Sequence, residues 1–104
     1  MFPKHVRIRS PKHLEWVRTQ LCAVIGCGVR QCDPAHVRRG TDGGTGVKPG
    51  DNWVNPLCRT HHHEQHQVGE PAFERRHGLD LKALAAKTWG RSPVNRNSAV
   101  ANFG

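Results

Sequence analysis

The spacing of apolar residues predicts three helices and one short helical turn. Two of the helices, over 11–21 and 81–89, carry apolar side chains three or four positions apart, which places those side chains on one helix face. A third helix is predicted over 59–67 and a helical turn over 73–77. The flanking residues support these assignments, because serine or aspartate caps a first turn, proline fits it, and glycine ends a helix. Ser10 and Pro11 begin the helix over 11–21, and Gly69 and Pro71 follow the helix over 59–67. Gly78 follows the segment over 73–77, and Asp80 precedes the helix over 81–89.

Short apolar runs at 35–37 and 53–54 predict two strands. The segment 40–46 between them is a glycine-rich loop, too flexible for a helix. Upstream, residues 22–32 hold three cysteines with glycines between them, a pattern typical of a knuckle-like turn rather than a regular element. The chain is therefore expected to form a small α+β domain with few short strands and flanking helices.

Composition limits the size of the hydrophobic core. The chain has 104 residues, of which 36 % are hydrophobic, together with 11 glycines and 7 prolines. A chain of this length forms one domain with a thin core, which commonly needs a metal or disulfides for stability. We expect a basic arm over 1–10, the folded domain over 11–90, and a disordered tail over 91–104, because the last segment is polar and aperiodic.

The cysteines favour a metal over disulfides. The first residues contain no apolar stretch of signal-peptide length, and no segment approaches a membrane span. A cytoplasmic location is expected, where thiols stay reduced and clustered Cys and His residues more often bind metal. A disulfide-linked secreted protein is the disfavoured alternative.

The charge favours a polyanionic partner. Sixteen Lys and Arg residues against 8 Asp and Glu give a formal net charge of +8. In a small protein this favours nucleic acid, with DNA first and RNA second, although solubility alone can also explain such a charge. Neither a membrane nor a small-molecule cofactor is expected as a partner.

Two close pairs of ligands predict a structural zinc site. Cys22 and Cys27 are separated by four residues, and Cys58 and His61 by two. Two such pairs about thirty residues apart form the usual layout of a tetrahedral zinc site. Cys32 could replace one of the upstream cysteines, but a plain buried thiol is the preferred interpretation of this residue.

A second pair of histidines lies on the same predicted helix. His62 and His66 are four positions apart, so their rings share a face and can converge on one ion. His61 then points toward the zinc, and His63 toward solvent. A helix with merely exposed histidines is the alternative.

These residues together resemble the HNH endonucleases. The resemblance rests on Ala35-His36, the glycine-rich loop, the run Asp51-Asn52-Trp53-Val54-Asn55-Pro56-Leu57-Cys58, and His61-His62 after a two-residue gap. It covers roughly 12–89 and implies a ββα-metal fold, in which a two-stranded hairpin and a helix hold one divalent ion. The order of cysteines and histidines is similar to that of zinc-containing HNH proteins of phages and prophages.

The resemblance also implies a role for individual residues. His36 matches the general base that activates water, and His62 and His66 match ligands of the catalytic ion. Cys22, Cys27, Cys58 and His61 match the structural zinc quartet, with His61 in place of the more frequent cysteine. Asn52 or Asn55 takes the position of the middle asparagine. Ala35 stands where many members have a further ligand, which Asp33 or water would supply.

We therefore expect a metal-dependent endonuclease that hydrolyses phosphodiester bonds in DNA. A histidine that titrates near neutral pH can take a proton from water, while a bound Mg²⁺, Mn²⁺, Ni²⁺ or Zn²⁺ stabilises charge on the phosphate. Arg38, Arg39 and Lys48 would bind flanking phosphates in a salt-dependent manner. The alternative is a non-catalytic, zinc-containing nucleic-acid-binding module.

Overall fold

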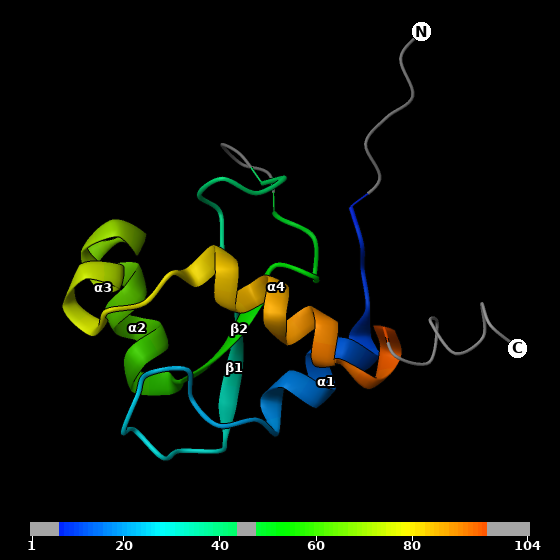
Figure 1. The fold of residues 1–104 in the computed structure, drawn as a ribbon, viewed down its shortest axis with the longest axis horizontal. Helices are drawn as coiled ribbons and strands as arrows, with labels where there is room; N and C mark the ends of the chain where they lie inside the picture. Colours follow the sequence, from blue (N-terminus) through cyan, green and yellow to red (C-terminus); the bar gives the residue numbers. More distant parts are fainter. Residues whose placement is uncertain (1–6, 44–47, 96–104) are drawn as a thin grey trace, which may run out of the picture.

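A computed structural model describes residues 7–43 and 48–95 of the chain. The chain order is one helix, two strands and three further helices (Figure 1). The elements are α1 (Pro11–Arg18), β1 (Cys32–His36), β2 (Val54–Cys58), α2 (Arg59–Val68), α3 (Glu70–His77) and α4 (Leu81–Arg91).

The two strands form an antiparallel sheet at the centre of the molecule. Cys32 pairs with Cys58 at one end and His36 with Val54 at the other. Pro34 faces Pro56 across the pair. A two-stranded sheet tolerates both prolines because each strand is an edge strand, so the missing N–H groups need not break a ladder. The small α+β class expected from the sequence is confirmed.

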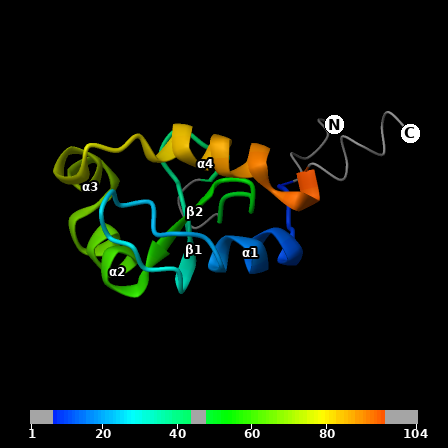
Figure 2. The ribbon, with the colours of Figure 1, turned by 60° about the horizontal axis from the view of Figure 1, so that its bottom comes forward.

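Helices cover the sheet on both sides. Figure 2 shows the strands lying between α4 and α1, with α2 and α3 beyond one end of the sheet. The helix α4 packs against β2, and α1 packs against both strands. Every residue of β2 is buried, and the core around it contains Leu57, Phe73, Leu81 and Ala85, each no more than 1 % exposed.

Several boundaries differ from those expected from the sequence. The first helix ends at Arg18 rather than at residue 21, so Leu21 lies outside it and is 47 % exposed. The strands are longer than the apolar runs 35–37 and 53–54, because prolines and polar residues take part in them. α2 begins directly at Arg59, so the chain order here is strand, strand, helix.

Both ends of the predicted domain extend further than expected. Residues 7–10 of the expected arm contact the loop before β2, where the Asp51 N–H donates to the Ile8 carbonyl at 2.7 Å. At the other end α4 continues to Arg91, and Ser92 is fully buried against His13 of α1. The rest of the expected arm, 1–6, part of the glycine loop, 44–47, and most of the expected tail, 96–104, lie outside the described residues. In the described part, no helix is long and apolar enough to cross a membrane.

Candidate functional site

Three cysteines and one histidine converge where the knuckle before β1 meets the start of α2. One ligand atom each from Cys22, Cys27, Cys58 and His61 lies within 4.8 Å of the other three, so this four-ligand cluster could hold a metal ion. All four cysteines of the chain have free thiols. The four residues that the sequence paired for zinc are thus brought together.

The distances within the four-ligand cluster fit a tetrahedral zinc site. The sulfurs of Cys27 and Cys58 are 3.8 Å apart. The His61 Nδ1 atom is 3.2 Å from the Cys58 sulfur and 3.5 Å from the Cys22 sulfur. Zn–S bonds of about 2.3 Å and Zn–N bonds of about 2.0 Å at tetrahedral angles require about 3.8 Å between sulfurs and about 3.5 Å between sulfur and nitrogen.

Local backbone and burial explain why these thiols suit a cation. Gly26 and Gly28 have φ values of 85° and 77°, a conformation that L side chains rarely adopt, and they form the turn that presents Cys27. Burial raises the pKa of the Cys22 thiol to about 12. A thiolate at this position therefore needs a nearby positive charge, which a metal ion supplies.

Cys32 lies outside the four-ligand cluster, as expected. It is 5 % exposed at the first position of β1, and its thiol faces the Val29 carbonyl at 3.5 Å. Burial raises its pKa to about 11. It is a buried neutral thiol.

The second histidine pair also converges. The Nε2 atoms of His62 and His66 lie 3.1 Å apart on one face of α2. The other ring nitrogen of His62, Nδ1, lies 3.0 Å from the Asp33 carboxylate of β1. With its Nδ1–H donated to Asp33, His62 directs the lone pair of Nε2 toward His66. The pair can therefore offer two nitrogens to one ion, while Asp33 orients His62 instead of binding directly. His63, as expected, is exposed.

His36 is held by a carboxylate that the sequence interpretation left without a role. Its Nε2 atom lies 3.0 Å from Oδ1 of Asp51, which is 3 % exposed. Burial lowers the pKa of His36, and the hydrogen bond to Asp51 opposes that shift only in part. For Asp51, burial alone would raise the pKa, but the hydrogen bonds from His36 and from the Ser10 N–H outweigh it and lower the pKa. At neutral pH His36 is thus uncharged and donates Nε2–H to Asp51, and its Nδ1 atom has no hydrogen-bond partner among the described residues.

Neither candidate asparagine contacts the base. Asn55 is 1 % exposed on β2, pairs with the buried Ala35, and donates to the Leu81 carbonyl at 2.9 Å, so it joins β2 to α4. Asn52 lies in the turn beside Asp51, and its Oδ1 atom is buried without a partner in the described part of the chain. Asp51, and neither asparagine, is the hydrogen-bond partner of His36 in the described part of the chain.

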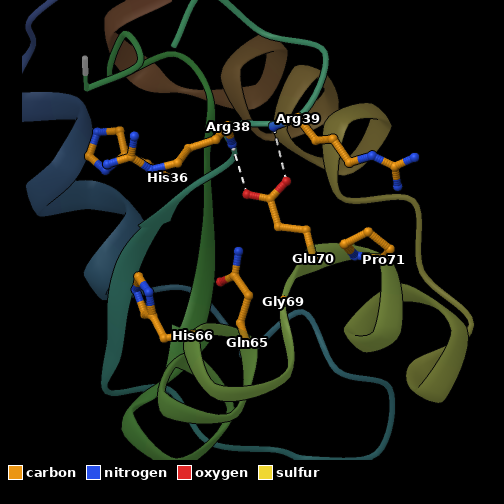
Figure 3. Close-up of a pocket in the computed structure, with 8 residues that line it drawn as sticks. All are labelled: His36, Arg38, Arg39, Gln65, His66, Gly69, Glu70 and Pro71. Atoms are coloured by element: carbon orange, nitrogen blue, oxygen red, sulfur yellow. Dashed lines mark hydrogen bonds between the residues drawn. The ribbon is translucent and has the colours of Figure 1, made fainter. Parts of the chain in front are cut away.

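His36 and His66 line the same pocket, of about 390 Å³, between the end of β1 and the junction of α2 and α3. Arg38 and Arg39 lie at its upper rim, and the Glu70 carboxylate accepts their backbone N–H groups at 2.8 and 3.0 Å (Figure 3). The Glu70 carboxylate thereby fixes the backbone of both arginines.

Gln65 forms the floor of this pocket. In Figure 3 its amide lies between His66 and Glu70. The residue is 5 % exposed, yet its Oε1 atom has no hydrogen-bond partner among the described residues. A buried acceptor without a partner costs about 1–3 kcal/mol, so a ligand donor is a natural explanation for it. No sequence signal identified Gln65 or Glu70.

Lys48, the third expected phosphate ligand, lies near the base. It is exposed, and its positive charge is one of the smaller causes of the lowered His36 pKa, after burial. The Arg9 guanidinium donates to the Lys48 carbonyl at 3.1 Å, which ties this loop to the residues before α1.

Comparison with known proteins identifies a relative and a family but no described activity. The chain is similar to the uncharacterized protein YdfU of Escherichia coli strain K12, with 42 % identity over 82 residues. This match covers 79 % of the chain and 23 % of the relative, so the chain spans about a quarter of that protein. No solved structure matches the chain. A family model described as "Protein of unknown function (DUF968)" matches residues 1–92, and the chain therefore belongs to the DUF968 family.

Proposed function

We propose that this domain is a metal-dependent endonuclease with an HNH-type ββα-metal site, acting on phosphodiester bonds of DNA. One observation carries the proposal: an uncharged histidine oriented by a carboxylate, His36, lines a pocket together with one member of a converging histidine pair, His66. The two arginines at the rim of that pocket suit a phosphate, because a guanidinium matches its oxygens.

The residues of the chain divide the chemistry between them. His36 Nδ1 accepts the proton of the attacking water, and Asp51 stabilises the imidazolium that forms. His62 and His66 would hold a divalent ion, with Asp33 fixing the ring of His62. Such an ion would polarise the phosphate and stabilise charge on the leaving oxygen. Arg38 and Arg39 position the strand at the pocket rim.

The four-ligand cluster supports this site structurally. Its ligands come from the knuckle and from the start of α2, the helix that carries His62 and His66. Zinc bound there would fix the position of α2 against β1. We therefore assign zinc a structural function and the histidine pair the catalytic ion.

A plasmid-cleavage assay tests the proposal. Wild type, His36→Ala and His63→Ala should be compared with Mg²⁺, Mn²⁺, Ni²⁺ and Zn²⁺, and with no added divalent ion. His36→Ala should lose about 10²–10⁴-fold in rate, the contribution of a general base, whereas the exposed His63 should be replaceable without loss. His62→Ala should also lose activity, with partial recovery at high metal concentration.

The same assay can contradict the proposal. If wild type cleaves no plasmid with any of the ions, or if His36→Ala cleaves as fast as His63→Ala, the nuclease assignment fails. Retained salt-sensitive DNA binding in that case would favour the non-catalytic module.

A further inference from the structure

A second hollow lies on the other side of the histidine pair from the pocket of His36. It measures about 500 Å³ and lies where the end of α1, the start of β1 and the first turn of α2 meet. Its lining residues are Arg18, Gln31, Cys32, Asp33 and Arg59. The carboxylate of Asp33 joins it to the candidate site, since this group hydrogen-bonds His62.

We propose that this hollow binds backbone phosphates of the nucleic acid beside the candidate cleavage site, through Arg18 and Arg59. The inference rests on the proposed function and extends it by adding a second contact surface. Phosphate-binding arginines would then flank the histidine pair on both sides, with Arg38 and Arg39 on one side and Arg18 and Arg59 on the other.

The charges of the hollow fit an anion. Both arginines are exposed, and among the described residues neither guanidinium has an ion pair or hydrogen bond. The Asp33 carboxylate hydrogen-bonds His62 at 3.0 Å, so the hollow sets two guanidinium charges against one carboxylate and keeps a net positive charge. Two unpaired, forked donors at one hollow match the oxygens of a phosphodiester.

The other lining residues add hydrogen bonding without competing chemistry. Gln31 is exposed and offers an amide N–H₂ donor. Cys32 is buried and its thiol donates to the Val29 carbonyl, so this residue lines the hollow without offering a reactive group to a ligand.

The experiment compares two double variants of equal charge. In a His36→Ala background, which binds without cutting, Arg18→Ala/Arg59→Ala is compared with Arg75→Ala/Lys87→Ala. The control residues are exposed on α3 and α4 and have no partner among the described residues. Binding of a fluorescent 20-base-pair duplex of arbitrary sequence is measured between 50 and 200 mM salt. Zinc content and thermal unfolding verify that every variant is folded.

The expected results separate the hollow from general charge. Losing two phosphate contacts should lower the slope of log K against log salt by about 1.8 and weaken binding by about tenfold or more, whereas the control pair should do neither. Arg18→Lys/Arg59→Lys should recover the salt slope but not all of the affinity, because lysine lacks the fork. With His36 intact, the alanine pair should raise KM more than it lowers kcat.

Two outcomes overturn the proposal. Equal slopes and affinities for the two double variants mean that the hollow holds no phosphate, and so does an absence of duplex binding by the His36→Ala protein. The nuclease proposal can fail separately. A protein that binds duplex through Arg18 and Arg59 but never cleaves it would support this inference and contradict the nuclease proposal.

Discussion

At the scale of single residues, the hydrogen-bond partner of His36 sets it apart from an exposed histidine such as His63. The Nε2 atom of His36 is hydrogen-bonded to Asp51, its Nδ1 atom has no partner in the part of the chain that the structure describes, and burial lowers its pKa. Asp51 itself lies at the centre of a small network, since it also accepts the Ser10 N–H at 2.8 Å. The arm before α1 and the candidate base are thus held by one carboxylate.

Replacing Asp51 by asparagine should weaken catalysis and move its pH dependence. The negative charge that stabilises the imidazolium is lost, so we expect a fall in kcat of about 10²-fold, within the usual contribution of an assisted base. In the proposed mechanism activity requires neutral His36, so we expect it to be present above the His36 pKa and lost as pH falls through that pKa. Because Asp51 raises that pKa, Asp51→Asn should move the acid limb of the kcat/KM profile to lower pH.

Kinetics from pH 4.5 to 8 with Glu15→Gln as control check this prediction. Glu15 is an exposed carboxylate on α1 and should leave both the limb and the rate unchanged. If the acid limb of the kcat/KM profile lies at the same pH in Asp51→Asn and wild type, that limb reflects the titration of a group other than His36.

Gln65 offers a second prediction for a single residue. Its Oε1 atom is buried without a partner, so Gln65→Leu removes an unsatisfied acceptor and should leave Tm equal or higher. If a substrate donor satisfies that atom, the same variant should lose about 1–3 kcal/mol of substrate affinity, seen as a raised KM. Gln67 is exposed on the same helix, so Gln67→Leu serves as the control. A Gln65→Leu variant with a raised Tm and an unchanged KM would show that this side chain does not bind the substrate.

Among the elements, the knuckle and α2 depend on each other through the four-ligand cluster. Residues 22–31 of the knuckle form no strand or helix, and they are connected to β2 by the hydrogen bond from the Ala23 N–H to the Pro56 carbonyl, at 2.7 Å. A segment with so few backbone bonds gains its fixed shape from the ligands it supplies. Metal removal should therefore affect the position of α2 as well as the knuckle.

Cysteine-to-serine variants at two buried positions test this dependence. Cys58→Ser should lose the bound zinc and unfold the domain, because the binding energy of such a site is largely folding energy, on the order of 10 kcal/mol. Cys32→Ser should keep one zinc per chain and most of its stability, since its thiol lies outside the cluster. Metal analysis and circular dichroism give the answer. Zinc retained by Cys58→Ser, or lost by Cys32→Ser, would require a different ligand set.

At the scale of the whole molecule, α1 and α4 meet through a buried histidine. His13 is fully buried, its Nδ1 atom lies 2.8 Å from the Ser92 hydroxyl, and its ring packs on Trp16 and Trp89. Its Nε2 atom has no partner among the described residues. Burial lowers the pKa of His13, against a smaller opposing effect of Asp51.

His13 should make the fold less stable in acid. Because its folded pKa lies below the unfolded value of about 6.5, the unfolded chain binds the proton first. The stabilisation is therefore complete above about pH 6.5 and is lost as pH falls through the folded pKa. His13→Phe keeps an aromatic ring but cannot titrate, so its deficit in free energy of unfolding relative to wild type should shrink between pH 7.5 and 5.

Urea denaturation at several pH values measures this difference. His63→Gln removes an exposed histidine and should change the pH dependence little. A deficit of His13→Phe that stays constant would show that His13 has the same pKa in the folded and unfolded chain, and a deficit that grows in acid would show that folding raises that pKa.

The sequence by itself determined the elements whose signals are local. Ser10 caps α1 and Asp80 caps α4, as their side chains accept N–H groups three residues on. The helix at 59–67 and the ligand pairs were also recoverable, because four-residue spacing on a helix and two close pairs of ligands depend on short stretches of chain.

Only the tertiary structure decided which partners meet across the chain. Pro34 and Pro56 lie within the strands, so the sequence pattern predicted strands that were too short. The strand register fixes the positions of Asp33 and His36 relative to α2 and the loop before β2. That register brings Asp51 to His36, Asp33 to His62, and Asn55 to α4 rather than to the base. Such contacts join residues 15 to 29 positions apart in the chain, where periodicity carries no information and only packing sets the geometry.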